Sequence, residues 1–500
     1  YWAYGGDWDE RLNDANFCVN GVIGPRREWS AKLTEVAHVQ QDLEVVAADA
    51  SKGAARLVNR AAFTFADAYD GEWALFEDGV RIAGGRLEVP HLAPQSAGEI
   101  VLPHPRDFVR KDGCEYFYRV GFKLKAAADW APKGWEVAHD QLKYGPPPRP
   151  IARPQGDGCR CRMEDSGSSV TVRFGDSLAK FSRETGTLSA LEMNGKTILA
   201  DAQGICRGPR LTCQRAFTDN DQSVRKGFCA SGLTQLRYHA RPIATGRCAD
   251  GSIVISNVVE VTGSKSAAFR HEQVWRFRGD GSLELENASI PRGEVPRLPR
   301  LGLSMVLDPS LENMRYYGRG PWENYIDRCS GSDIAYWEST VTDQYVEYAR
   351  PQDNGYKCDV RWVAFVDAEG DGVLFKGSVP HFVQALHYSM TELELQRHRG
   401  AGSWSDASKE RFYAPMFPRG EIMLNLDVRQ LGLGNASCGP GPLECYTFPN
   451  RREKWTMTLV PVGKGGFDAF RKAAGKVRQT ISPSPHRGSL REAGLGFDGG

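Results

Sequence analysis

The chain has 500 residues, in which 63 lysine and arginine residues nearly balance 62 aspartate and glutamate residues. A chain of this length and ordinary composition predicts about two to four domains with sizeable cores. The balanced charge, without a basic stripe, argues against nucleic acid or an anionic membrane as partner. No stretch is apolar enough for a membrane helix, so we expect no membrane association.

Twelve cysteines are too few for a disulfide scaffold of this length, and no pair of Cys-x-x-Cys motifs suggests structural zinc. We therefore expect mostly free thiols in a reducing compartment. The cytoplasm is the expected location, in preference to the periplasm or the outside of the cell.

The first 30 residues are dense in glycine, aspartate and asparagine, which is typical of an active-site loop. Residues 31–42 then place Leu33, Val36 and Val39 at helical spacing behind Ser30, a favourable N-cap residue. The sequence predicts one loop followed by one helix.

Residues 43–147 consist of short alternating runs broken by glycine, proline and aspartate, which predicts a small antiparallel β-sandwich. A proline-rich stretch at 146–154 predicts a stiff linker. Residues 160–463 again carry almost only strand signals and predict one large β-sandwich. Residues 464–500 lose this pattern and are expected to form a poorly ordered tail.

The block YGGDWDERLNDANFCVNG resembles the segment near the end of the catalytic barrel in the large bacterial β-galactosidases of glycoside hydrolase family 2. Seven further blocks follow in the order of that family, and together they span about residues 1 to 460. These blocks are SAKLTEVAHVQQ, NRAAFTF with WALFEDG, RAFTDND, YYGRGPWENYIDR, YVEYARPQDNGYKCDVRW, ALHYSMTELELQRHR and LNLDVRQLGLGNASCGPG.

The resemblance implies a mainly β chain. Residues 1–42 would be the last strand, loop and helix of a (β/α)₈ barrel, 43–147 an immunoglobulin-like sandwich, and 160–463 a large sandwich related in fold to galactose mutarotase. Because such a barrel needs roughly 250 residues, we expect this chain to be the C-terminal half of such an enzyme.

The family hydrolyses terminal β-galactosides such as lactose with retention, which requires two carboxyl groups roughly 5 Å apart. Neither of the family's two glutamate contexts occurs here, so we expect the chain alone to be inactive. The resemblance also implies that the parent enzyme is a homo-oligomer. Glu115, which follows Cys114 and precedes Tyr116, is the glutamate whose neighbours come closest to one of these glutamate contexts. Its place in an alternating run predicts a solvated strand residue.

In the resembled family, the loop that matches Asn13 to Asn20 lines the galactose pocket. The backbone carbonyl of Phe17 and the amide oxygen of Asn20 would help to bind Na⁺, and Asn20 would also face the sugar. The remaining carboxylate ligand would come from the N-terminal part of the parent enzyme. Taken without the resemblance, Asn13, Asp14 and Asn20 are ordinary turn residues.

The resemblance also assigns Glu323, together with Asn13, to a Mg²⁺ site at the edge of the active site. One carboxylate, one amide and several waters suit this ion, which gives up its hydration shell reluctantly. The alternative interpretation is that Glu323 is an exposed loop carboxylate. Asp219 and Asp221 are expected to hold loop geometry through bonds to the backbone.

The loop LGLGNASCGPG matches the place where the large sandwich reaches the catalytic pocket. Many members of the family use a tryptophan there as a stacking platform, whereas this sequence has Cys438. We interpret Cys438 as a substrate-facing position with an altered preference for the aglycone. A structural free thiol is the alternative.

Two other functions compete with that of a β-galactosidase fragment. The first is a carbohydrate-binding or small subunit without catalytic residues of its own, which would dock on a separate catalytic chain. The second is mutarotase activity, suggested by fold analogy alone. It would need a histidine and a carboxylate that face one sugar site, and it would be excluded if His381, His387 and His398 lay away from any shared cleft. Lone histidines in a β-sandwich more often pack and form hydrogen bonds.

Overall fold

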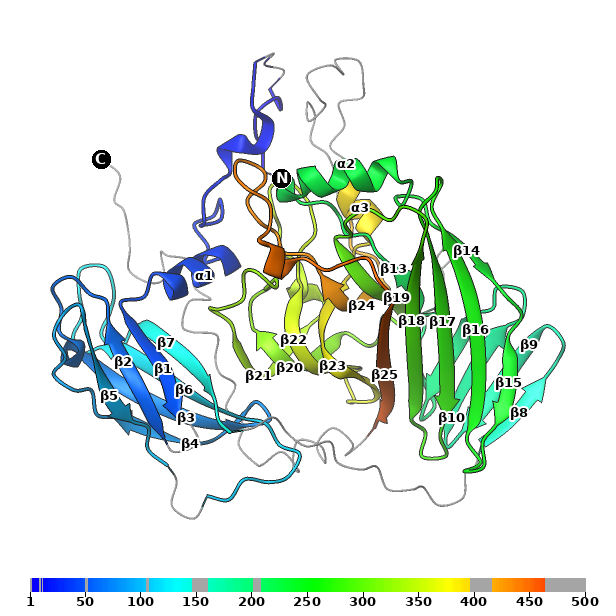
Figure 1. Ribbon diagram of the computed structural model, residues 1–500, viewed down its shortest axis with the longest axis horizontal. Helices are drawn as coiled ribbons and strands as arrows, with labels where there is room; N and C mark the ends of the chain where they lie inside the picture. Colours follow the sequence, from blue (N-terminus) through cyan, green and yellow to red (C-terminus); the bar gives the residue numbers. More distant parts are fainter. Residues whose placement is uncertain are drawn as a thin grey trace.

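The computed structural model describes residues 2–8, 10, 12–49, 53–104, 108–145, 161–200, 208–395 and 416–463. These ranges are mainly β, which confirms the predicted fold class (Figure 1). The expected linker at 146–154, the expected tail at 464–500 and His398 lie outside the described residues. None of the helices in these ranges is long and apolar enough to span a bilayer.

The helical elements are η1 (Ala15–Cys18), α1 (Ala31–Val39), η3 (Ala66–Ala68), η4 (Asp219–Asp221), α2 (Gln222–Ala230), η5 (Thr342–Gln344), α3 (Met390–Leu395) and η6 (Glu444–Tyr446).

The strands of the first part of the chain are β1 (Leu43–Asp49), β2 (Ala54–Asn59), β3 (Tyr69–Glu77), β4 (Val80–Leu87), β5 (Ser96–Val101), β6 (Tyr116–Leu124) and β7 (Glu136–Lys143). They form two antiparallel sheets, in the orders β1-β2-β5 and β4-β3-β6-β7. One apolar core joins the sheets, with Leu43 and Leu57 on one side and Trp73, Tyr118 and Phe122 on the other. We call this unit the first sandwich.

The strands that follow are β8 (Cys161–Asp165), β9 (Ser169–Phe174), β10 (Ser177–Ser182), β11 (Leu188–Met193), β12 (Lys196–Thr197), β13 (Arg210–Thr212), β14 (Arg237–Ala240), β15 (Ala244–Arg247), β16 (Ile253–Thr262), β17 (Ala268–Phe277), β18 (Leu283–Arg292), β19 (Arg300–Leu307), β20 (Asn313–Gly320), β21 (Asp333–Thr340), β22 (Lys357–Val366), β23 (Gly372–Leu386), β24 (Ile422–Gln430) and β25 (Glu453–Val462).

These strands form the large sandwich, in which a five-stranded sheet of order β12-β11-β10-β9-β8 covers part of a thirteen-stranded sheet. Burial in β16 and β17 alternates residue by residue, as the sequence pattern predicted. Aromatic side chains join the two layers, because Phe181 of the small sheet lies edge to face with Trp275 and Phe277 of the large one.

The N-terminal segment, residues 2–42, agrees only in part with the prediction. Helix α1 begins behind Ser30, whose side chain accepts the backbone N–H of Leu33 at 3.1 Å. The expected barrel strand is absent from residues 2–8, 10 and 12–42. A strand of a parallel barrel takes its ladder bonds from neighbours on both sides, and the described residues do not supply them.

The junction between the two sandwiches corrects the prediction for Glu115. This residue is buried, with 7% of its surface exposed, and it is not a solvated strand residue. Arg361 of the large sandwich donates two bonds to its carboxylate, at 2.8 and 2.9 Å, and Tyr317 donates a third at 2.9 Å. Alternation along a strand predicts which face a side chain takes, but not whether a second domain covers that face.

A second buried ion pair crosses the same junction. Arg119 of β6 forms a two-pronged pair with Glu136, at 2.8 and 2.9 Å, and donates to Asp333 of β21 at 2.6 Å. Between the ion pairs, Phe76 and Phe117 of the first sandwich pack in one cluster with apolar residues of the large sandwich. The two sandwiches therefore share a buried interface.

Replacing Arg361 with methionine should leave the buried Glu115 carboxylate with only the more distant, exposed Lys143 as a counter-ion, 3.5 Å away. We expect the free energy of unfolding to fall by about 3 kcal/mol, as is usual when one partner of a buried pair is removed. The matched control is Arg183→Met, which breaks an exposed pair with Asp165 and should change stability little. Urea unfolding followed by tryptophan fluorescence measures both. Equal, small effects would contradict a structural role for the buried pair.

The junction should also make stability depend on pH. Burial alone would raise the pKa of Glu115, but the hydrogen bonds and charge of Arg361 outweigh it and hold the pKa below its ordinary value. The unfolded chain therefore takes up the proton first, so this stabilisation is complete above about pH 5 and is lost as the pH falls further. Urea midpoints between about pH 7 and about pH 3.5 should fall more steeply for the natural chain than for Glu115→Gln. If the urea midpoints of the natural chain and of Glu115→Gln fell equally with pH, Glu115 would not be the source of this pH dependence.

Candidate functional site

The segments that the resemblance assigns to the sugar site meet at one end of the large sandwich. Figure 1 draws the N-terminal segment (blue) and the loop at 431–446 (orange) at this end, and residues of the turn at 219–221 bond to both. The side-chain amide of Asn16 donates to Asp219 at 2.7 Å, which ties the N-terminal loop to the large sandwich. The amide of Asn220 donates to the carbonyl of Gly434 at 2.7 Å, which ties in the third segment. We call this group of loops the loop end.

A buried ion pair fixes the loop at 215–221. Arg215 donates two bonds to Asp221, at 2.6 and 3.0 Å, and each residue is 1% exposed. The same carboxylate accepts the backbone N–H of Thr218 at 2.9 Å, so Asp221 holds the loop geometry as predicted. Arg215 also donates to the carbonyl of Leu431 at 2.9 Å, and this bond fixes the start of the neighbouring loop.

Cys438 lies in a turn of that neighbouring loop. Asp327 accepts the backbone N–H groups of Leu433 and Gly434, at 2.9 and 2.8 Å, at the base of the loop. The N–H of Cys438 donates to the carbonyl of Asn435 at 3.0 Å, and its free thiol is exposed. An exposed side chain on a fixed turn suits a position that faces a ligand better than one that fills a core.

Asn13 takes part in local turn chemistry. Its side-chain oxygen accepts the N–H of Ala15 at 3.1 Å, and its amide donates to the carbonyl of Glu10 at 3.0 Å. Both polar atoms of the side chain therefore hold the turn that leads into η1. Asn13 thus acts as an ordinary turn residue, which is the interpretation of the sequence taken without the family resemblance.

The two residues proposed to bind Na⁺ lie in contact. Asn20 is exposed, and its amide nitrogen donates to the backbone carbonyl of Phe17 at 2.5 Å. A half turn of the amide would place two neutral oxygens side by side, and neutral oxygen donors suit a hard monovalent cation. As the structure stands, the carbonyl of Phe17 accepts a hydrogen bond from Asn20, and the two residues would offer two oxygens to a sodium ion only after that turn.

Glu323 is buried, with 5% of its surface exposed, so the alternative of an exposed loop carboxylate is wrong. One carboxylate oxygen accepts from Arg328 at 2.8 Å and also from the hydroxyl of Tyr348. The other oxygen accepts the N–H of Gly355 at 2.7 Å. Although burial alone would raise the pKa of Glu323, the charge of Arg328 holds it below its ordinary value, so the residue is ionised and already paired.

The surroundings of Glu323 do not fit a magnesium ion. Besides Arg328, its charge acts on Lys32 and on Lys357, which is buried. Burial lowers the pKa of Lys357 to about 8, while the charge of Glu323 opposes that shift. Three cationic groups around one carboxylate repel a divalent cation. Within the described ranges, no cluster of three or more histidine, cysteine, aspartate and glutamate side chains is placed to hold a metal ion.

Of the histidines considered for mutarotase chemistry, His387 is held by hydrogen bonds and His381 by packing. His387 contacts the carbonyl of Glu421 at 3.1 Å and the carboxylate of Glu312 at 2.8 Å. His381 is 3% exposed, and burial lowers its pKa to about 4, so its ring is neutral. His387 therefore has the packed, hydrogen-bonded role that the sequence predicted, whereas neither ring nitrogen of the buried His381 has a hydrogen-bond partner among the described residues.

The sequence interpretation missed the residues that join the loops. Asn16 and Arg350 both bind Asp219, and the side chain of Gln352 accepts the N–H of Asp219 at 3.2 Å. Arg350 and Gln352 lie in the recognisable block at 345–362, but nothing in its pattern indicates which loop it meets. Only the folded chain brings these segments together.

Two family models match this chain. The model described as beta galactosidase small chain matches residues 174–459, which is more than half of the chain. The model described as beta-galactosidase, domain 4 matches residues 55–145. The two matched regions correspond to the large sandwich and the first sandwich.

Among curated proteins, a β-galactosidase of Priestia megaterium is 28% identical over 472 residues, which cover 92% of this chain and 43% of that protein. β-Galactosidase BgaC of Bifidobacterium adolescentis is 27% identical over 466 residues, covering 89% and 41%. The chain thus spans about two fifths of the length of these relatives. Among solved structures, galactose 1-epimerase from Lactobacillus acidophilus is 8% identical with a TM-score of 0.34, covering 61% of this chain and 98% of that one.

The match over 174–459 exceeds half of the chain, and curated relatives that share the name β-galactosidase extend the similarity over most of the remainder. This chain belongs to the β-galactosidase small chain family.

Proposed function

We propose that this chain supplies the sugar-facing loops of an enzyme that hydrolyses terminal β-galactosides with retention of configuration. The two catalytic carboxylates would come from polypeptide other than the residues described here. The relatives named β-galactosidase are more than twice as long as the region they share with this chain, which leaves room for such a part. The meeting of the three segments at the loop end supports the assignment.

The surface of the N-terminal segment is the observation that carries this proposal. Large apolar side chains of this segment are exposed: Trp8 72%, Leu12 84%, Phe17 54%, Val22 37%, Ile23 41% and Val39 63%. Helix α1 buries none of its residues. A segment with so much exposed apolar surface is suited to an interaction site, and the missing catalytic part is the partner we assign to it.

The residues of the loop end then have different roles in binding the substrate. Asn20 faces the sugar and, with the carbonyl of Phe17, holds Na⁺; a sodium ion there would fix the loop and attract hydroxyl oxygens of the galactose. Cys438 borders the aglycone, where its small side chain leaves space that a stacking aromatic would fill. Glu323 keeps its loop in place through Arg328 and Gly355 and is not proposed as a Mg²⁺ ligand.

Mixing experiments test the proposal directly. We expect no hydrolysis of a chromogenic β-galactoside by this chain alone, because the covalent route needs the absent carboxylates. Activity should appear when the chain is mixed with the N-terminal part of a β-galactosidase such as that of Priestia megaterium. Robust activity of the chain alone would overturn the assignment. A mixture that binds the β-galactoside but never hydrolyses it would also overturn the assignment, and would favour a subunit that only binds carbohydrate.

Variants of exposed apolar residues show whether the N-terminal segment forms the contact. Leu12→Asp should abolish the activity of the mixture, because it places a charge in the proposed interface. The matched control is Phe63→Asp, since Phe63 is 92% exposed but lies in the first sandwich. Equal effects of the two substitutions would argue against docking through residues 2–42.

In the reconstituted enzyme, Asn20→Ala should lower kcat/KM by about tenfold to a hundredfold through the loss of a sugar hydrogen bond. It should also raise the sodium concentration needed for half-maximal activity. The control is Asn313→Ala, because the amide of Asn313 likewise donates to a backbone carbonyl, that of Asp367 at 3.1 Å, but at the opposite end of β20 from the loop end. If Asn20→Ala left both kcat/KM and the sodium response unchanged, Asn20 would be excluded as a residue of the sugar and sodium site.

A further inference from the structure

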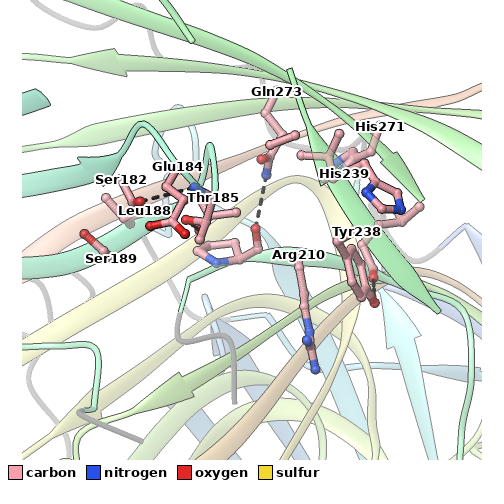
Figure 2. Close-up of a pocket in the computed structure, with 15 residues that line it drawn as sticks. Ser182, Glu184, Thr185, Leu188, Ser189, Arg210, Tyr238, His239, His271 and Gln273 are labelled. Carbon is pink, nitrogen blue, oxygen red and sulfur yellow. Dashed lines mark hydrogen bonds between the residues drawn. The ribbon is translucent and has the colours of Figure 1, made fainter. Parts of the chain in front are cut away.

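A cavity of about 760 Å³ lies away from the loop end, between the two layers of the large sandwich. The turn between β10 and β11 forms one wall, and strands β13, β14, β16 and β17 form the other. Figure 2 shows Ser182, Glu184 and Ser189 on one side and Tyr238, His271 and Gln273 on the other. A cavity of this size can hold a small ligand.

The large sheet carries buried amide side chains next to the cavity, where a sandwich core normally carries apolar ones, and one of them, Gln273, lines it. Asn257, Gln273 and Asn287 face one another on the adjacent strands β16, β17 and β18, and none is more than 4% exposed. The amide of Asn257 donates to Gln273 at 3.2 Å and to the carbonyl of Gly186, in the opposite turn, at 2.8 Å. This amide ladder therefore connects the two walls.

Hydrogen bonding within this region is incomplete. Among the described residues, the side-chain oxygens of Asn257 and Ser289 are buried without a hydrogen-bond partner. Ser289 pairs in register with His271, a residue that lines the cavity. Neither Asn257 nor Ser289 lines the cavity, so these groups lie behind its wall; the residues of that wall that do line it, His271 and Gln273, present polar side chains to the cavity.

His271 gives the cavity a neutral hydrogen-bonding group. One ring nitrogen contacts the side-chain oxygen of Asn287 at 3.1 Å. Burial lowers the pKa of His271 to about 4, so the ring is neutral and its second nitrogen can accept a hydrogen bond. Two ionic groups at the rim, Glu184 and Arg210, have opposite charges. The cavity therefore favours a neutral ligand over an ion.

Hydroxyl and aromatic groups complete the lining. Ser182, Thr185 and Ser189 bring hydroxyls from the β10 and β11 side, and the ring of Tyr238 lies opposite them. The guanidinium of Arg210 lies over the Tyr238 ring, 5.0 Å from its centre, so the ring is already packed and the match rests on the polar groups. A saccharide matches this surface, because its hydroxyls both donate and accept hydrogen bonds. We propose that this cavity is a second, non-catalytic binding site for a neutral saccharide, separate from the loop end.

Blocking the cavity mouth tests this proposal in the full chain. Thr185 is an exposed turn residue, so Thr185→Arg should fill the entrance without disturbing the core. The matched control is Thr245→Arg, on the exposed strand β15 outside the cavity. Titration calorimetry with lactose and with maltose should show binding of at least one sugar to the natural chain and to the control. The affinity of Thr185→Arg should be lower by about tenfold or more.

Two further measurements separate this site from the loop end and from misfolding. Maltose has no galactose unit for the loop end to recognise, so binding of maltose that Thr185→Arg weakens belongs to the cavity. In protein with isotope-labelled histidine, saturating sugar should shift the ring signal of His271, and this readout does not depend on any variant. The proposal is overturned if neither sugar binds, if Thr185→Arg binds as tightly as the control, or if saturating sugar leaves the ring signal of His271 unchanged. None of these outcomes depends on hydrolysis, so the proposed function is tested separately.

Discussion

The buried charges between the two sandwiches are the constraint on which the arrangement of this protein depends. A carboxylate or guanidinium taken out of water must keep its partner, because an unpaired buried charge is far more costly than a broken surface pair. Glu115 and Arg119 belong to the first sandwich, while Arg361 and Asp333 belong to the large one. Since α1 leads directly into β1 of the first sandwich, this junction also sets where the N-terminal segment meets the loops of the large sandwich.

The loop end depends on a different kind of interaction. Here asparagine and aspartate side chains bind backbone groups of neighbouring loops, as Asp327 does for the loop that carries Cys438. Such bonds fix the path of a loop without a hydrophobic core beneath it. Side chains such as Asn20 and Cys438 therefore remain at the surface, where a partner and a ligand can reach them.

The sequence predicted what depends on local pattern. Period-two alternation predicted strands such as β16, and the position of Ser30 predicted the start of α1. Pattern could not predict the burial of Glu115 or of Glu323, because each depends on residues that only the folded chain brings near. The amide ladder required the register of three strands, since Asn257 and Asn287 are ordinary polar residues in the sequence. The expected barrel strand is a further example. The family resemblance implies this strand, but a strand needs neighbours to bond with, and the described residues supply none for it.

The edge of the thirteen-stranded sheet at β21 is covered by the first sandwich. The side-chain amide of Gln141 exchanges two hydrogen bonds with the backbone of Ile334, at 2.9 and 2.8 Å, and the carbonyl of Gly79 accepts the N–H of Tyr336 at 3.0 Å. The first sandwich thus occupies the place of a further strand and shields an edge that could otherwise pair with another molecule. A gene that encoded the large sandwich alone would yield a product with this edge open to self-association. Recombination would therefore be expected to move the two regions together, as one unit of inheritance.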